Sequence, residues 1–417
     1  MASENTIFIQ IASYRDPELK HTIKDCLSKA KYPENLRFAI AWQHDNTENL
    51  DRYLLDSRFH IIDIPYYKSN GACWARNLLQ KKFNNEKFTL QIDSHHRFVK
   101  NWDEKLILMH QKLVKDGYKK PVLTAYLPSY DPEKDPDKRI NLPWKMNFDR
   151  FTPEGVVFFL PASIDNFEKL SSPIRSRFYS AHFCFAPGSF VLDVPHDPLY
   201  YFHGEEISIS ARAFTHGYDL FHPHQVIAWH EYTRKNRTKH WDDDKYWHFK
   251  NNICHARNRK LLGVDGEFND INFKEFGLGK KRSLKEYEIY AGICFNDRSV
   301  SKECLQNIEP KRVVKLDEYD NWRSGLLKIF KHCVNVPVQK IPKDIDYDFW
   351  YVGFFDPSAN EIYRQDVTGN ELEQLLNTQS DNYQIWRTFT PKCAPFICRI
   401  WPHSKSNGWL SHIDIKI

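Results

Sequence analysis

Asp93, Ser94 and His95 form the clearest chemical motif of the sequence, a DxH pattern. They directly follow Phe88–Ile92 (FTLQI), a run typical of a buried β-strand. Aspartate offers hard oxygen ligands and histidine a nitrogen ligand, a combination that favours a transition metal such as manganese over calcium. Two protein ligands would leave coordination positions for the oxygens of a diphosphate, whose charge a cation neutralises. The same pattern also occurs at ordinary strand-to-loop turns, where the aspartate bonds only to nearby backbone.

Polar residues also stand where two earlier strands are predicted to end. Ser13, Arg15 and Asp16 follow the first strand, and Asp45 follows the second. Ligands of open α/β sheets bind at the carboxyl ends of strands, which makes these side chains candidates for ligand binding. Arg15 and Asp16 could instead pair with each other and cap the helix that follows.

Four further candidates each leave two interpretations open. Glu205 and Glu206 open a predicted helix, where substrate contact and a favourable interaction with the helix dipole would each account for them. Arg76 lies on another predicted helix, and its side chain could bind a ligand or could be a solvated surface charge. His230 follows the apolar run VIAW, and it could be a metal ligand or a histidine packed in the core.

The elements that must position these residues alternate between strands and helices, which indicates a mainly parallel α/β sheet. The predicted strands are 6–12, 36–42, 60–64 and 88–92, and the predicted helices are 17–30, 71–83, about 205–216 and 282–292. The segment 129–147 is rich in proline and aspartate and predicts a long loop. Strand-like runs at 348–355 and 396–401 predict a small β-rich C-terminal domain. We therefore expect two domains, 1–300 and 301–417.

Composition excludes several classes of function. A hydrophobic fraction of 41% rules out a wholly disordered chain of 417 residues, and a net charge of +5 does not argue for a nucleic-acid partner. The apolar runs are shorter than a membrane span requires, and the N-terminus does not resemble a signal peptide. The nine scattered cysteines include no CxxC pair, so we expect mostly buried thiols in a reducing cytoplasm.

Six segments together resemble two related families of glycosyltransferases. The segments are IASYRDPE at 11–18, GACWARN at 71–77, DSHHRF at 93–98, HGEE at 203–206, HEYTR at 230–234 and LGKKRSLKEY at 278–287. A DxH motif, a Gly-Glu pair opening a helix and a distant His closely followed by an Arg resemble the mucin-type polypeptide N-acetylgalactosaminyltransferases. The segments are more similar to the cytoplasmic-type polypeptide (hydroxyproline) α-N-acetylglucosaminyltransferases, which modify a ubiquitin-ligase subunit. The resemblance covers about residues 5–295 and not the C-terminal domain.

The resemblance implies a role for each candidate residue. The metal ligands would be Asp93, His95 and His230. The residues near the nucleotide and its diphosphate would be Ser13, Arg15, Asp16, Asp45, Arg76, Asp93 and Ser94. Glu205 and Glu206 would bind sugar hydroxyls, and Arg234 would meet the diphosphate from a lid.

The implied protein is an α/β enzyme of the GT-A glycosyltransferase class. It would use UDP-GlcNAc as donor and Mn²⁺ or Mg²⁺ as cofactor, retain the anomeric configuration and modify a polypeptide hydroxyl. A polysaccharide or glycolipid acceptor stays open, and so does a non-catalytic sugar- or peptide-binding protein on the same scaffold. A metal hydrolase is disfavoured, because no general base stands out beside the metal ligands. Aromatic residues of the C-terminal domain could form a carbohydrate-binding face or pack in its core: Trp350, Tyr351, Phe354, Phe355, Trp386, Trp401 and Trp409.

Overall fold

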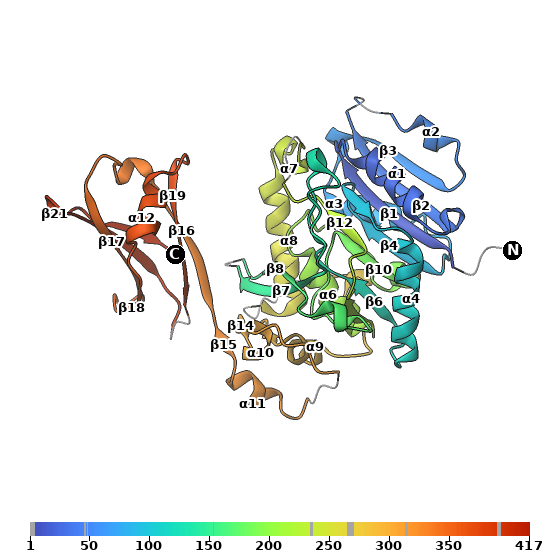
Figure 1. Cartoon of the computed structure of the whole chain (residues 1–417). Coiled ribbons are helices and arrows are strands. Elements are labelled where there is room, and N and C mark those ends of the chain that lie inside the picture. The colour runs from blue at the N-terminus through green and yellow to red at the C-terminus, as the bar shows by residue number, and fades with distance from the viewer. Residues whose placement is uncertain are drawn as a thin grey trace. The chain divides into compact units, whose positions relative to one another are not determined.

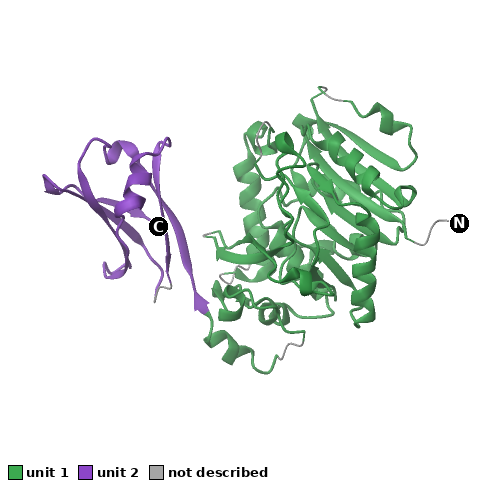
Figure 2. Ribbon diagram, viewed as in Figure 1, with its two compact units in different colours: residues 1–326 green, residues 327–417 purple. Residues whose placement is uncertain are grey.

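The chain folds into two compact units, residues 1–326 and 327–417 (Figure 2). The computed structural model describes residues 5–45, 47, 49–152, 154–233, 237–264, 271–312, 316–389 and 393–417. The division lies beyond the predicted boundary at residue 300, because helices α10 (Lys302–Leu305) and α11 (Tyr319–Ser324) belong to the first unit. The Tyr319 hydroxyl there donates to Glu288 of helix α9 (Leu284–Ala291), 2.5 Å away.

The first unit is built on an eight-stranded sheet in the order β3-β2-β1-β4-β10-β6-β11-β9 (Figure 1). Strands β1 to β4 are mutually parallel, so their carboxyl ends meet at one edge. Strand β10 runs antiparallel to both of its neighbours, β4 and β6. The strands of this eight-stranded sheet are β1 (Ile7–Tyr14), β2 (Leu36–His44), β3 (Phe59–Pro65), β4 (Phe88–Ile92), β6 (Pro121–Thr124), β9 (Ile174–Arg175), β10 (Phe183–Pro187) and β11 (Asp219–His222).

Helices cover both faces of this sheet, as the alternation of buried side chains along β1 requires. Ile9 and its neighbours on that side pack against α1 (Leu19–Lys29) and α4 (Trp102–Lys115). Phe8 points to the opposite face and packs with α3 (Ala72–Gln80). Helix α6 (Glu205–Thr215) covers that second face further along, over β6 and β10. The sheet is therefore the middle layer of three.

Further strands and helices complete the first unit. Its remaining strands are β5 (His96–Phe98), β7 (Trp144–Phe151), β8 (Val157–Ser163), β12 (Ala228–His230), β13 (Ile293–Cys294) and β14 (Ser299–Val300). Its remaining helices are α2 (Asp51–Leu54), α5 (Phe190–Asp193), α7 (His240–Asp243) and α8 (Trp247–Leu262).

The second unit is a small β-rich fold with its own core. One sheet pairs β16 (Phe330–Pro337) with β19 (Asn382–Phe389), and the other contains β18 (Glu361–Arg364), β17 (Tyr347–Phe355), β20 (Ile397–Ser404), β21 (Gly408–Trp409) and β22 (Ile413–Lys416). The short strand β15 (Leu327–Lys328) precedes them, and helix α12 (Gly369–Leu376) lies between β18 and β19 in the chain. Val334, Trp350, Ile385 and Ile400 come from both sheets and share one buried cluster.

The predicted α/β architecture with a small β-rich C-terminal domain is confirmed, but the predicted elements did not include α4, α8 or β7. Strand β7 begins at Trp144, inside the segment 129–147 that was predicted to be a loop, because its backbone pairs with that of β8, a partner that the local sequence does not reveal. All nine cysteines are unpaired thiols and seven are buried, as expected. Every helix in the described part of the chain is too short or too polar to cross a membrane.

Candidate active site

The candidate site lies where β1 and β4 end, at the parallel edge of the sheet. All five residues of β4 are buried, and Asp93 is the first residue beyond them. Strand β1 pairs in parallel with β4, with Ile11 opposite Ile92, so the residues after both strands emerge together. This brings Asp16 next to the Asp93–His95 segment.

His230 reaches the same place through a separate strand pair. Strand β12 pairs antiparallel with β5, and His230 lies opposite His96 in this register. The Nε2 atoms of His230 and His95 are 3.0 Å apart. The carboxylate atom Oδ2 of Asp93 lies 3.5 Å from His230 Nε2 and 3.7 Å from His95 Nε2. The three side chains named as metal ligands from the sequence therefore converge.

The spacing of these three atoms fits a metal ion. For metal–ligand bonds of about 2.1 Å, neighbouring ligands in octahedral or tetrahedral geometry lie about 3.0–3.4 Å apart. His95 Nδ1 donates a hydrogen bond to the carboxylate of Asp16, so the other ring nitrogen, Nε2, faces the carboxylate of Asp93. Converging acceptors repel one another unless a cation or a proton lies between them. A carboxylate with two imidazoles suits a transition metal such as manganese or zinc better than calcium.

Asp16 and Ser94 form a hydrogen-bonded group with His95 on the side of its ring that faces away from Asp93. Asp16 Oδ2 accepts hydrogen bonds from His95 Nδ1 and from the Ser94 hydroxyl, both at 2.7 Å. A carboxylate behind a metal-binding histidine fixes its tautomer and ring orientation. Arg237 also reaches this group, with Nη1 3.2 Å from Asp16 Oδ2. Asp16 and Ser94 were predicted to lie near the nucleotide, and the structure places both behind His95 in the cleft wall.

Burial and charge set the protonation of the ligand group. Burial on its own would raise the pKa of Asp93, but the hydrogen bond with His230 and the guanidinium of Arg76 hold it well below its usual range. Burial and the neighbouring His182 lower the pKa of His230. The ring of His182 stacks on that of His230 at 4.1 Å, and burial lowers its own pKa to about 3. Near pH 7, Asp93 is therefore a carboxylate and His230 a neutral imidazole, which are the metal-binding forms of these two side chains.

Arg76 joins the metal-ligand group to helix α6. Its Nη2 atom lies 3.0 Å from Asp93 Oδ1 and its Nη1 atom 2.8 Å from Glu205 Oε2. The Arg76 side chain is only 5% exposed, so it is a buried cation held between two carboxylates rather than a solvated charge. The thiol of Cys73, one turn earlier on α3, donates to the same oxygen of Glu205.

Gly71 sets the position of α3 and hence of Arg76. Its φ of +99° is rarely open to other residues, and a Cβ atom there would lie 2.5 Å from the carbonyl oxygen of Tyr201. The Ala72 amide donates to that same carbonyl at 3.2 Å. The glycine of the GACWARN segment is therefore required by a close approach of two backbones.

Glu206 has different surroundings from Glu205. One oxygen accepts from the Ala181 amide at 2.9 Å and the other from the Tyr126 hydroxyl at 2.7 Å. Burial raises the pKa of Glu206 to about 7. It is therefore a carboxyl group poised to be neutral or ionised close to neutral pH.

These residues line one cleft of about 690 Å³. Its walls include these predicted candidates: Asp16, Arg76, Asp93, Ser94, His95, Glu205, Glu206 and His230. Four further side chains that were not predicted to belong to the site also line it: Tyr126, His182, Tyr232 and Arg237. Arg237 belongs to a basic run that the sequence does display, whereas Tyr126 and His182 reach the cleft only through folding. The predicted lid residue Arg234 lies outside the described residues.

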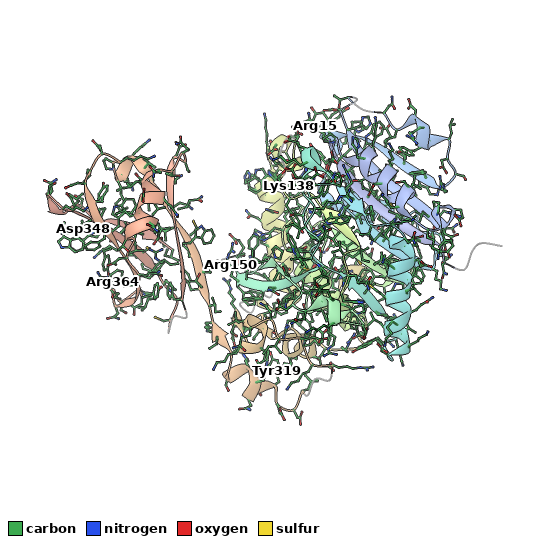
Figure 3. All side chains as sticks on the ribbon, in the orientation of Figure 1. Arg15, Lys138, Arg150, Tyr319, Asp348 and Arg364 are labelled. Atoms are coloured by element: carbon green, nitrogen blue, oxygen red, sulfur yellow. The ribbon has the colours of Figure 1, made fainter. Side chains whose placement is uncertain are left out.

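Three predicted nucleotide-binding residues do not line this cleft. Ala12 and Tyr14 do, and because side chains alternate along a strand, Ser13 between them is directed away and is buried. Arg15, labelled in Figure 3, pairs with Asp45 at 2.9 Å and with Asp243 at 2.8 Å. Arg15 thus joins the ends of β1 and β2 to α7 instead of pairing with Asp16.

A second group of potential ligands lies nearby and is already neutralised. Cys73, His196 and Glu205 each offer an atom within 4.8 Å of the others. Arg76 donates a hydrogen bond to Glu205, so its guanidinium already neutralises the negative charge that a metal ion would otherwise balance.

Comparisons with known proteins give one family and several structural likenesses. A family model described as Glycosyltransferase (GlcNAc) matches residues 6–55 and 46–297. A search of curated proteins gave no significant match. Among solved structures, the chain is similar to GalNAc-T7, crystallised with UDP, GalNAc and Mn²⁺, at 14% identity and a TM-score of 0.43. That similarity covers 69% of this chain and 48% of the other, so this chain spans about half the length of the GalNAc-T7 chain.

The chain is also similar to S. aureus TarS 1-349. The complex of TarS with UDP has 10% identity and a TM-score of 0.39, and covers 76% of this chain and 78% of that one. The complex with UDP-GlcNAc has 12% identity and a TM-score of 0.38, with 77% and 79% covered.

Proposed function

The chain belongs to the Glycosyltransferase (GlcNAc) family, and from that premise we propose that it transfers N-acetylglucosamine from UDP-GlcNAc to a hydroxyl group. The carrying observation is the convergence of Asp93, His95 and His230 in a cleft of about 690 Å³ at the carboxyl edge of the sheet. These three residues would hold Mn²⁺ or Mg²⁺. When bound, that cation supplies positive charge that stabilises the departing diphosphate.

The chain's own residues would bind and orient the donor. Arg237 lies in the cleft wall beside Asp16 and would contact the negatively charged diphosphate. Glu205 and Glu206, at the start of α6, line the same cleft and would bind hydroxyl groups of the sugar. Arg76 fixes Glu205 and Asp93 relative to each other, which keeps the sugar and diphosphate ends of the site in register. Positioning of this kind contributes to catalysis because it holds the reacting groups in the geometry that the reaction requires.

We propose that the transfer retains the anomeric configuration. The acceptor oxygen would bond to C1 of the sugar as the bond from C1 to the diphosphate oxygen breaks, and the hydroxyl proton would pass to that departing oxygen. Two observations support attack without a covalent enzyme intermediate. Asp93 and Glu205 are both paired with Arg76, and Glu206 is partly protonated near neutral pH, which makes all three weak nucleophiles.

The acceptor we propose is a polypeptide hydroxyl, in the cytoplasm. The proposal is supported by the resemblance of the six sequence segments to the polypeptide-modifying transferases, and this resemblance covers about residues 5–295. A hydroxyl on a polysaccharide would need the same chemistry at C1, so the acceptor has to be identified by experiment.

The test is release of UDP from a panel of UDP-sugars, with Mn²⁺, with Mg²⁺ and with a chelator. We expect slow hydrolysis that is selective for UDP-GlcNAc and lost with the chelator, and an initial product in the α configuration. Asp93→Ala should abolish release, whereas Asp63→Ala, at an exposed carboxylate of β3, should not. Full activity of Asp93→Ala with metal bound would overturn the site assignment. Preference for another sugar would overturn the donor, and neither binding nor release with any donor would favour a non-catalytic protein.

A further inference from the structure

We propose that the C-terminal unit binds a neutral carbohydrate on one outer face of its larger sheet. The face, called here the aromatic face, consists of Phe349, Trp401, His403, Trp409 and His412. The inference depends on residues 327–417 alone and does not depend on which donor the cleft of the first unit accepts.

Strand pairing assembles the aromatic face. Phe349 of β17 lies opposite His403 of β20, and His403 lies opposite Trp409 of β21. The rings of Phe349 and His403 stack at 5.2 Å, and the ring of Trp409 lies 5.0 Å from His403 and 5.4 Å from Phe349. Trp401 adds a ring 4.7 Å from Trp409, and His412 lies 5.8 Å from Trp401. Five rings thus form one continuous surface on a hydrogen-bonded scaffold.

The opposite side of the same strands supplies the core of the unit. Trp350 and Phe354 of β17 are fully buried and pack with Cys398 and Ile400 of β20. Side chains alternate along a strand, which places Phe349 and Trp401 on the other side. Trp409 is 47% exposed. The sequence left these two uses of the aromatic residues open, and folding divides them between the two sides of the sheet.

Charged groups lie on the strands of the same sheet. Asp348, labelled in Figure 3, approaches His403 at 3.4 Å. Arg399 of β20 forms two hydrogen bonds of 2.7 Å with Asp414 of β22. Arg364, also labelled in Figure 3, lies over the ring of Tyr351 at 4.6 Å. Planar charged groups beside flat apolar rings suit a pyranose, which presents an apolar C–H face and a rim of hydroxyl groups.

The charge of the unit favours a neutral ligand. Residues 327–417 contain ten Lys and Arg against ten Asp and Glu. Nucleic acids and anionic membranes are recognised through an excess of positive charge, which this unit does not have. A neutral glycan needs no such excess, and rigid aromatic rings can bind it at little cost in side-chain entropy.

The experiment uses the full-length chain and soluble neutral oligosaccharides. Chitotetraose, cellotetraose and mannotetraose are titrated without nucleotide or metal, with calorimetry and tryptophan fluorescence as readouts. Asp93→Ala is titrated in parallel, so that binding in the cleft is recognised. We expect at least one oligosaccharide to bind wild type and Asp93→Ala equally, and Trp409→Ala to weaken this binding by about tenfold.

The matched control is Trp386→Ala, since Trp386 is also 47% exposed but lies on β19 in the other sheet. This control should bind within a factor of about two of wild type. A second variant of the aromatic face, His412→Ala, removes an exposed side chain and should weaken binding without affecting folding. Unchanged thermal unfolding and circular dichroism establish that the variants fold.

Three results would overturn the inference. They are no binding of any of these oligosaccharides at millimolar concentration, equal losses in Trp409→Ala and Trp386→Ala, and a shift from dimer to monomer in Trp409→Ala without sugar binding. The last would identify the aromatic face as a contact between two copies of the chain. Donor hydrolysis should remain normal in Trp409→Ala, so failure here and failure of the proposed transferase activity are distinguishable.

Discussion

Asp16 and His95 are linked by a hydrogen bond of 2.7 Å between Oδ2 and Nδ1, although they lie 79 positions apart in the chain. This bond directs Nε2 of His95 toward Asp93 and His230. We predict that Asp16→Asn weakens Mn²⁺ binding by about 10- to 100-fold, because an amide holds the ring less firmly and stabilises it less. Calorimetric titration with Mn²⁺, in the absence of donor, measures the change.

The control for this prediction is Asp103→Asn. Asp103 is equally buried, but its carboxylate accepts from the Lys31 and Tyr32 amides, away from the cleft. Its substitution should lower stability and leave Mn²⁺ affinity unchanged. Equal affinities of Asp16→Asn and wild type would show that Asp16 does not orient His95.

Arg76 and Glu205 should be strongly coupled in stability. Removing one partner leaves the other charge buried and unpaired, so Arg76→Met and Glu205→Gln should each lower the unfolding free energy by roughly 3–5 kcal/mol. The double variant should lose clearly less than the sum of the two. Urea denaturation of the four proteins measures this coupling. The exposed pair Lys112 and Asp116 is the control, with an expected coupling below about 1 kcal/mol, and additive losses at Arg76 and Glu205 would contradict the prediction.

Glu206 should make stability depend on pH. Burial raises its pKa from an ordinary 4.5 to about 7, so the folded chain binds more protons than the unfolded chain between these values. Its contribution to the unfolding free energy therefore falls as pH rises from about 4.5 to 7, by roughly 3 kcal/mol, and is constant above that range. Glu206→Gln lacks this loss, so it should gain stability relative to wild type as pH rises.

Denaturation at pH 4.5, 6 and 8 measures the difference between Glu206→Gln and wild type. The exposed Glu303→Gln on α10 is the control, and its difference from wild type should stay nearly constant. Parallel stability profiles of Glu206→Gln and wild type would contradict the raised pKa.

Gly71→Ala should be costly for two reasons. The backbone conformation at Gly71 costs other residues about 1–3 kcal/mol, and the added Cβ atom would lie 2.5 Å from the Tyr201 carbonyl oxygen. Gly263→Ala has a positive φ of +65° with open space around it, so it should cost only about 1 kcal/mol. Thermal unfolding compares the two variants. We also expect Gly71→Ala, and not Gly263→Ala, to reduce donor hydrolysis, because α3 carries Arg76; equal effects of the two would rule out the close approach.

Local patterns were sufficient to predict several of the elements that carry the site, but not the pair of strands β5 and β12 that brings in His230. Strand β4 was predicted with its observed bounds, and α6 was predicted to begin at Glu205, where it does. These elements are encoded by short-range features, a β-rich apolar run and a glycine before two acidic residues. The strand β7 was missed because its pairing with β8 is not visible in its own residues.

The residue types and order of the sequence thus determined the α/β class and the three candidate ligands. Only the tertiary structure decided which groups touch: that Asp16 lies behind His95, that Arg76 is held between Asp93 and Glu205, and that Ser13 is directed away from the cleft. It also decided which aromatic residues of the second unit are core and which are surface. The physical reason is that strand register and helix packing join segments far apart in the chain, and a local pattern carries no information about the partner that it will meet.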